Sequence, residues 1–167
     1  MKIPAKLTHF NLFVDGKGLA GIINELTLPK LTMQTQDHQS GGMDAPVEVE
    51  MGMEKLESTY VLAEYNPDVI RLMGFRQGGS IALIARGALK VNDEVTAMTC
   101  TMRGKIKELD MGSWKKGDDT TMTFTVAVDY YRLDRGVENL IEIDVPNLIR
   151  KIGGVDQLSG VRNALLI

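Results

Sequence analysis

A glycine-rich run is the first group whose residue types and spacing could support chemistry. Gly16, Gly18 and Gly21 fit the pattern of a loop that binds the pyrophosphate of a dinucleotide. That function requires a helix to begin at the last glycine, because the amino terminus of the helix holds the phosphates. The residues that follow, 22–28, are strand-like and end at Pro29. We therefore interpret these glycines as turn residues and expect no cofactor.

The other reactive side chains also lack partners at useful spacing. Neither His9 nor His38 has a second ligand at the spacing of a metal site. The acidic residues between positions 110 and 119 lack the ligand spacing of a calcium loop. Cys100 lies in an alternating apolar segment, which is typical of a small buried hydrophobe and not of a nucleophile. We expect no metal site and no catalytic residues, so an enzyme is the weakest interpretation.

Composition favours one domain over residues 1–167, with an ordinary hydrophobic content of 44%. A net charge of −3 disfavours tight general binding to nucleic acid. A single cysteine is typical of a reducing compartment, so we expect synthesis in a cytoplasm. No apolar run reaches the roughly 18 residues of a membrane helix, and we expect no membrane insertion.

The elements that must position any site are mainly strands. Apolar residues alternate with polar or small ones through two segments, 98–107 and 121–131, and Gly104 interrupts the first. Period-two alternation over this length predicts strands, because helical faces recur every 3.6 residues. The apolar positions are Met98, Cys100, Met102 and Ile106 in the first segment, and Met122, Phe124, Val126, Val128 and Tyr130 in the second.

Shorter patterns complete the prediction. Asp15 and Gly16 predict a hairpin turn between strands 10–14 and 22–28. Asn66 and Pro67 predict the start of a helix that runs to Met73. Further strands are predicted at 31–36, 47–54, 81–89 and 140–144, and either one amphipathic turn or a short helix within 155–165. The expected fold is an antiparallel β-sandwich or barrel with one flanking short helix.

Several runs, in order along nearly the whole chain, resemble the major tail tube proteins of contractile-tailed phages and of R-type tailocins, which are pyocin-like particles. The segment 64–95 matches least. The matching runs are Asn11-Leu12-Phe13-Val14-Asp15-Gly16, Leu26-Thr27-Leu28-Pro29-Lys30-Leu31, Gly41-Gly42-Met43-Asp44-Ala45-Pro46-Val47, Met51-Gly52-Met53-Glu54, Arg103-Gly104, Gly112-Ser113-Trp114-Lys115, Val128-Asp129-Tyr130-Tyr131 and Gly154-Val155-Asp156-Gln157-Leu158.

The resemblance implies a structural protein of the virion tail or tailocin particle. Such a protein forms hexameric rings with a continuous inner β-barrel, and the rings stack into a hollow tube inside a contractile sheath. Its implied partners are further copies of itself, the sheath protein, the baseplate or tube initiator, and the tail terminator. A tape measure protein or DNA would occupy the lumen without specific binding, and no reaction would be catalysed.

Within such a tube, the inner sheet needs strands with one apolar and one wet face. Four segments qualify: 31–36, 47–54, 98–107 and 121–131. We expect Glu48 and Glu50 to face the lumen, where six-fold repetition would form acidic rings that repel phosphate. The alternative is that both are merely exposed, or pair across strands with Lys105 or Lys107.

Contacts between rings are expected from loops and chain ends. A glycine-containing loop is the first candidate, because its backbone is adaptable and Met43 can fill a pocket of a neighbour. The next candidates are residues 1–9 and 153–167, whose last residues are apolar. The candidate interface residues are Ser40, Gly41, Gly42, Met43, Asp44, Ala45, Pro46, Leu165, Leu166 and Ile167.

Two other functions remain open from the sequence. A tube protein of a type VI-like secretion system would share the fold and the stacking. A β-barrel that binds a small ligand would instead be a stable monomer with an apolar cavity.

Overall fold

Strand β9 (Met122–Arg135) is the centre of a ten-stranded antiparallel sheet in this computed structural model, which describes residues 1–74 and 79–167. Strand β8 (Glu94–Asp110) pairs along one side of β9. On the other side, β6 (Leu56–Leu62) pairs with the first half of β9, and β10 (Glu138–Asp144) pairs with the second half. The sheet therefore has two branches on this side of β9, one that begins with β6 and one that begins with β10.

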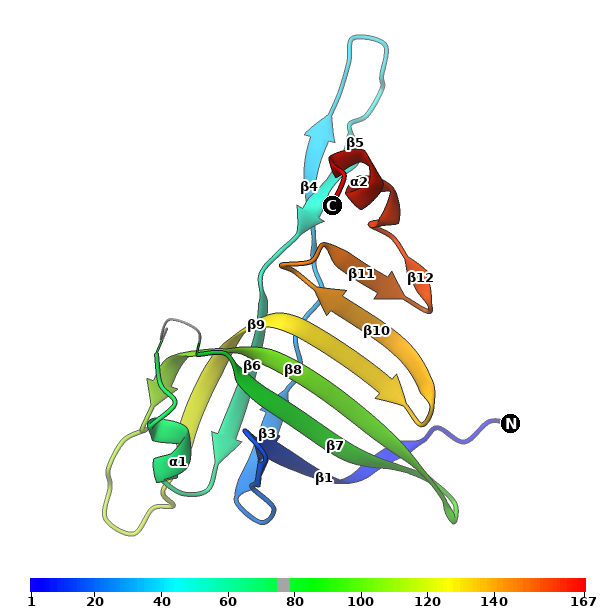
Figure 1. The fold of residues 1–167 in the computed structure, drawn as a ribbon. Helices are drawn as coiled ribbons and strands as arrows, with labels where there is room; N and C mark the ends of the chain where they lie inside the picture. Colours follow the sequence, from blue (N-terminus) through cyan, green and yellow to red (C-terminus); the bar gives the residue numbers. More distant parts are fainter. Residues whose placement is uncertain (75–78) are drawn as a thin grey trace.

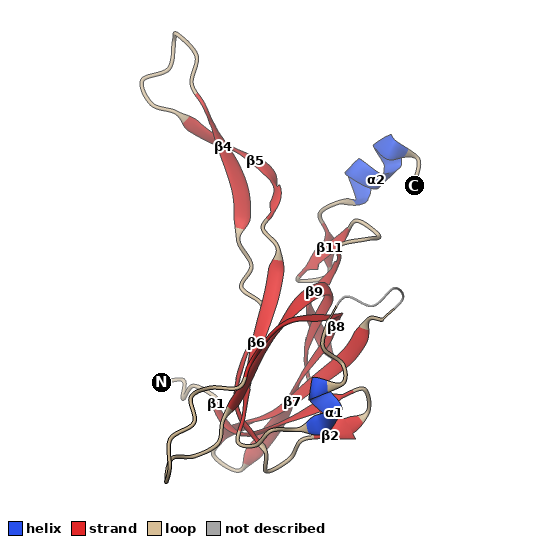
Figure 2. Cartoon of the chain, turned by 90° about the vertical axis from the view of Figure 1, so that its left-hand side faces the viewer, coloured by secondary structure: helices blue, strands red, loops and turns tan. Residues whose placement is uncertain are grey.

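The remaining strands extend the sheet in both directions and curl it around one core (Figures 1 and 2). Strand β3 pairs with β6 as a separate branch. All pairings between named strands are antiparallel, as predicted. The order beyond β8 is β7 (Ile81–Val91), β1 (Lys6–Val14) and β2 (Lys17–Gly18), the order beyond β10 is β11 (Ile149–Ile152) and β12 (Val155–Asp156), and β3 spans Ile23–Thr27.

A long hairpin stands apart from the sheet. Strands β4 (Met33–His38) and β5 (Val47–Met53) pair only with each other among the described residues, and they project away from the body (Figures 1 and 2). In the protomer, these two strands form a sheet separate from β8 and β9, and the expectation that all four segments line one inner sheet stays a prediction about the assembled tube. Strand β6, which pairs with the first half of β9, was not predicted from the sequence.

The alternation predicted for β9 holds up to Val128 and then changes phase. Phe124 and Val126 are buried, but Tyr131 is buried in place of Tyr130. The register explains the change, because Arg103 faces Tyr130 while Gly104 faces Val128, which leaves Asp129 as an extra residue. A one-residue bulge moves every later side chain to the opposite face. The expectation of Tyr130 on the apolar face is therefore wrong.

Gly104 has a steric role at this bulge. A Cβ placed on Gly104 would lie 2.1 Å from the carbonyl oxygen of Ala127. Strands β8 and β9 approach closely here because position 104 carries no side chain. The break that Gly104 makes in the apolar pattern of β8 thus reflects packing.

Two short helices flank the strands. Helix α1 (Pro67–Ile70) begins where predicted, with the Asn66 side chain accepting hydrogen bonds from the backbone N–H groups of Asp68 and Val69. It ends at Ile70, earlier than the predicted Met73. Helix α2 (Ser159–Leu165) lies within the 155–165 segment, at the same end of the protomer as the β4–β5 hairpin (Figures 1 and 2).

The predicted Asp15–Gly16 turn is present, with both residues at positive φ. Its return strand is only Lys17–Gly18, and the predicted strand 22–28 appears as β3, which pairs with β6 and not with β1. The Asp15–Gly16 turn and Pro29 located the strand, but such local signals carry no information on which distant strand pairs with it.

Candidate assembly interface

The β4–β5 hairpin has two different exposed faces. Residues directly opposite each other in an antiparallel pair share a face. Asp37 faces Glu48, which makes one face acidic, whereas Val47 and Val49 lie on the other face. Val47, Val49 and Met51 are 53%, 46% and 61% exposed. Such a row of uncovered apolar side chains is unusual for an isolated protomer and marks a contact surface.

The base of the hairpin is attached to the body by an ion pair. Arg150 Nη2 donates to Glu50 Oε1 at 2.5 Å, and Arg150 is buried on β11. Glu50 therefore pairs with a residue that the sequence analysis did not consider, since nothing in the local pattern links positions 50 and 150. Lys107, one of the partners considered earlier, pairs with Glu57.

The tip of the hairpin is exposed. Of the loop residues 40–46, Met43 alone is partly buried. The Met43 N–H donates to the Ser40 carbonyl at 2.9 Å, and the Ser40 N–H donates to Met43 Sδ at 3.5 Å. The tip is therefore a closed turn with its one large apolar side chain folded back against it, and the other predicted loop residues are open to a neighbour.

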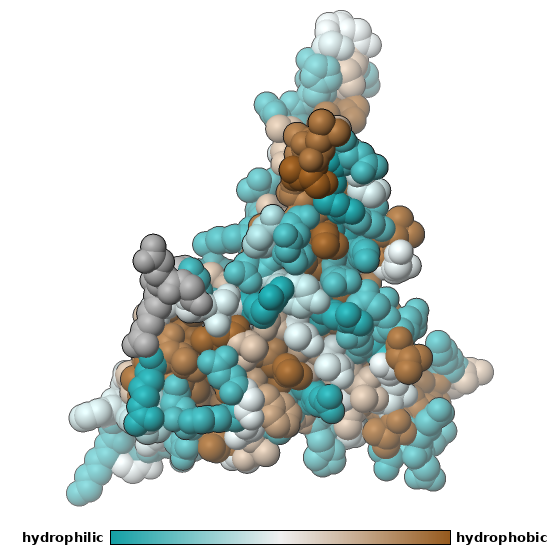
Figure 3. Space-filling model, in the orientation of Figure 1, coloured by the Kyte–Doolittle hydropathy of each residue, from teal (hydrophilic) through white to brown (hydrophobic). Residues whose placement is uncertain are grey.

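The end of the chain is a second exposed surface. Arg162 binds the Asp156 carboxylate at 2.5 Å and the Leu148 carbonyl at 2.7 Å, which fixes α2 to the body. The hydrogen bond from Arg162 holds the pKa of Asp156 below its ordinary value. Figure 3 shows apolar surface gathered over α2 and the end of the chain. Leu165, Leu166 and Ile167 are 58%, 92% and 73% exposed.

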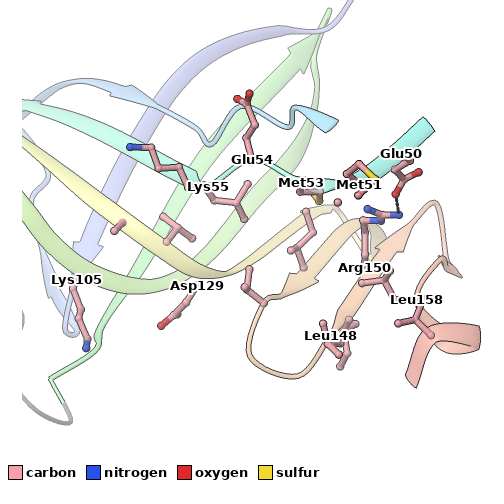
Figure 4. Close-up of a pocket in the computed structure, with 18 residues that line it drawn as sticks. Glu50, Met51, Met53, Glu54, Lys55, Lys105, Asp129, Leu148, Arg150 and Leu158 are labelled. Atoms are coloured by element: carbon pink, nitrogen blue, oxygen red, sulfur yellow. Dashed lines mark hydrogen bonds and ion pairs between the residues drawn. The ribbon is translucent and has the colours of Figure 1, made fainter. Parts of the chain in front are cut away.

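A groove separates the hairpin base from the C-terminal part of the sheet (Figure 4). Its volume is about 850 Å³, and Arg150 and Glu50 lie at one end of it, with Lys105 and Asp129 toward the other. The apolar residues that line it are Met51, Met53, Leu56, Val128, Ile143, Val145, Leu148, Ile149, Leu158 and Val161. The groove could not be predicted from the sequence, because its walls come from segments about 100 residues apart.

Reactive groups do not converge here or elsewhere in the part of the chain that is described. Within residues 1–74 and 79–167, no cluster of His, Cys, Asp and Glu could hold a metal ion. Burial raises the pKa of the Cys100 thiol to about 12, so the thiol stays protonated. Neither described helix has the length and apolar character to cross a membrane.

Sequence comparisons find relatives over nearly the whole chain. The family model for phage tail tube protein FII matches residues 4–165. The chain is 32% identical over 163 residues to the tail tube protein of Escherichia phage P2, covering 95% of each chain. It is 37% identical over 156 residues to the major tail tube protein of Serratia phage KSP20, covering 92% of this chain and 91% of that protein.

A solved structure supports the fold independently. The chain resembles a chain of the sheath–tube complex of an extracellular contractile injection system, PVC, in its extended state. The TM-score is 0.61 at 13% identity, over 78% of this chain and 91% of the other. The chain thus shares its fold with a chain of that complex, and the sequence matches extend over nearly the whole of this chain. The chain belongs to the phage tail tube protein FII family.

Proposed function

We propose that this protein is the subunit of the inner tube of a contractile phage tail or tailocin, with six copies in a ring and the rings stacked into a hollow tube. The observation that carries the proposal is the β4–β5 hairpin, whose strands pair only with each other in the described chain and leave Val47, Val49 and Met51 uncovered. Only other molecules can cover these side chains, and family membership makes further copies the natural choice.

Open backbone edges support ring formation. Among the described residues, β3 pairs on one side only, with β6, and most of β1 pairs only with β7. A strand edge that offers unpaired N–H and C=O groups is a template for another chain. Pairing with the next copy around a closed ring satisfies these groups without leaving a free edge.

Stacking uses the surfaces at the hairpin end of the protomer. The tip loop, residues 40–46, and the apolar end, residues 163–167, are largely exposed and lie at the same end of the protomer (Figures 1 and 2). With residues 1–9, they supply the contacts between successive rings. Met43 has the side chain to leave the tip turn and enter a pocket of the next ring.

The acidic face of the hairpin is assigned to the lumen. Glu48 and Glu50 lie on this face with Asp37. The ion pair with Arg150 neutralises the charge of Glu50, so Glu48 and Asp37 provide most of the negative potential. Six-fold repetition turns each position into an acidic ring, and DNA or a tape measure protein passes without specific binding.

The tube is a mechanical part, and the protein catalyses no reaction. The sheath surrounds the tube, a baseplate or initiator starts it, and a terminator ends it. On sheath contraction the tube is driven through the target envelope, and in a phage it conducts DNA. The site of action is therefore the virion tail or tailocin particle.

Analytical ultracentrifugation over a concentration series tests this function. The proposal expects material to move from protomers into very large particles as concentration rises, because each new ring buries the exposed surfaces of the last. A ligand-binding β-barrel would instead sediment as a monomer at every concentration, and that result would overturn the proposal.

A further inference from the structure

The groove beside the hairpin base is open in the protomer, and most of the side chains that line it are apolar. Met51 is 61% exposed on one wall, and Val145 and Val161 are 53% and 46% exposed on the other. Leaving apolar side chains in water costs roughly 25 cal/mol per Å² of apolar surface. The groove therefore gains stability when another apolar group enters it.

One polar feature indicates the kind of occupant. Arg150 lines the groove and is only 7% exposed, yet its Nε has no hydrogen-bond partner among the described residues. Its Nη2 is already occupied by Glu50, and its Nη1 has a weak contact with Met33 Sδ at 3.9 Å. A buried donor without an acceptor is costly. Arg150 Nε has almost no accessible surface in the protomer, so an acceptor such as a backbone carbonyl of an occupant pairs with it only when the Arg150 side chain shifts toward the groove.

Residues 1–5 of the chain have the matching chemistry. They form no helix or strand, and Met1 and Ile3 are 124% and 56% exposed. In Figures 1 and 2 this arm leaves the body and ends in solvent. Pro4 favours an extended backbone whose carbonyls are unpaired, and five extended residues span up to about 17 Å. Lys2 supplies a positive charge, and Glu54 at the groove rim supplies a negative one.

We propose that residues 1–5 of a second copy occupy this groove in the assembled tube. The inference rests on the proposed function, since it requires the copies to meet. Met1 and Ile3 cover the apolar walls, a backbone carbonyl of the arm accepts from Arg150 Nε, and Lys2 lies near Glu54. Each copy then carries both an arm and a groove at different places on its surface, which is the requirement for head-to-tail contacts that propagate from copy to copy.

Two other segments of a second copy are weaker occupants. The hairpin tip offers one large apolar side chain, Met43, in an otherwise polar turn. The apolar end of the chain follows α2, whose Val161 already forms part of the wall of its own groove. The arm alone combines alternating apolar side chains, a positive charge and an extended backbone.

Cysteine cross-linking in assembled material tests the proposal. Ile3→Cys is combined with Val161→Cys, and the native Cys100 is buried and does not interfere. Mild oxidation should give a ladder of linked chains on a non-reducing gel for tubes of this variant, and single chains for the dilute protomer. Met43→Cys with Val161→Cys and Leu166→Cys with Val161→Cys test the competing occupants.

A ladder from position 3 supports the proposal. Tubes that link only from position 43 or 166, or that form no ladder at all from position 3, overturn it. A wild-type protein that forms no tubes contradicts the proposed function itself, so the two failures are distinguishable.

Assembly thresholds give a second measurement that does not depend on cross-linking geometry. Ile3→Asp changes an exposed side chain, so the protomer should melt at the wild-type temperature. It should nevertheless need at least a tenfold higher concentration to form tubes. The matched control is Val137→Asp, on the fully exposed turn between β9 and β10, which should assemble as wild type. Wild-type assembly by Ile3→Asp would overturn the proposal.

Discussion

Arg150 on β11 binds Glu50 on β5 at 2.5 Å across 100 residues of sequence. The arginine is buried, whereas the Glu50 side chain is 51% exposed. This contact joins a hairpin that otherwise forms its own two-stranded sheet to the C-terminal part of the main sheet. It is therefore a polar contact between the hairpin and the body of the protomer.

Glu50→Gln should loosen the hairpin without unfolding the body. The substitution leaves the buried Arg150 charge without its counter-ion, and partial exposure of position 50 limits the cost to about 1–2 kcal/mol. Hydrogen exchange of the β4 and β5 amides should accelerate. Glu48→Gln, at an exposed position on the same face, is the matched control and should leave exchange unchanged. Equal exchange in both variants would show that the ion pair does not hold the hairpin.

Gly104→Ala should destabilise the protomer by roughly 2–3 kcal/mol, because its Cβ would collide with the Ala127 carbonyl and force β8 and β9 apart. Gly160→Ala, in α2 with open space around it, should be neutral or slightly stabilising, since alanine favours helix. Urea denaturation of both variants measures the difference. A Gly104→Ala protein as stable as wild type would contradict the close approach of the two strands.

Acid should release α2 before the core unfolds. The pKa of Asp156 is lowered from its ordinary value near 3.8 by the hydrogen bond from Arg162. A lowered folded-state pKa contributes stability above the ordinary value, and this stability is lost as pH falls through the folded value. NMR signals of the α2 amides should therefore shift as pH falls below about 3.8. Asp156→Asn should abolish that transition, and its persistence in the variant would assign it to another group.

We propose that stacking of the rings depends on the hairpin tip and the chain end. Deleting residues 163–167, or changing Met43 to Asp, should leave a folded protomer that no longer forms tubes. Both regions lie outside the buried core, so circular dichroism should match the wild type. Normal tubes in electron micrographs of either variant would remove that region from the ring contacts.

The lumen assignment can be tested with a single cysteine. Glu48→Cys in assembled tubes should react with a small maleimide but resist a large polymer-linked maleimide, because only small reagents diffuse along the channel. The free protomer should react with both reagents. Rapid labelling of tubes by the large reagent would place position 48 on the outer surface.

Local patterns in the sequence predicted much of the fold. The alternation of β8 and β9, the Asp15–Gly16 turn and the Asn66 cap depend on neighbouring residues, so each was visible in the chain. The phase change after Val128 was not, because the bulge at Asp129 arises from the fit of β9 against β8.

Pairing between strands that are distant in the sequence could not be predicted from local patterns. Nothing near position 56 showed that β6 lies between β3 and β9, and nothing near position 50 indicated Arg150. The groove beside the hairpin base is hidden for the same reason. The tip loop and the apolar chain end are exposed, as their composition indicated, and their role in contacts between rings stays a prediction.

Electron microscopy of the concentrated wild-type protein tests the central claim most directly, which is that exposed faces and open strand edges of one copy are covered by the next. The account predicts uniform hollow tubes whose end-on views show six-fold rings. A field of compact single particles at every concentration, with no rings or tubes, would contradict it.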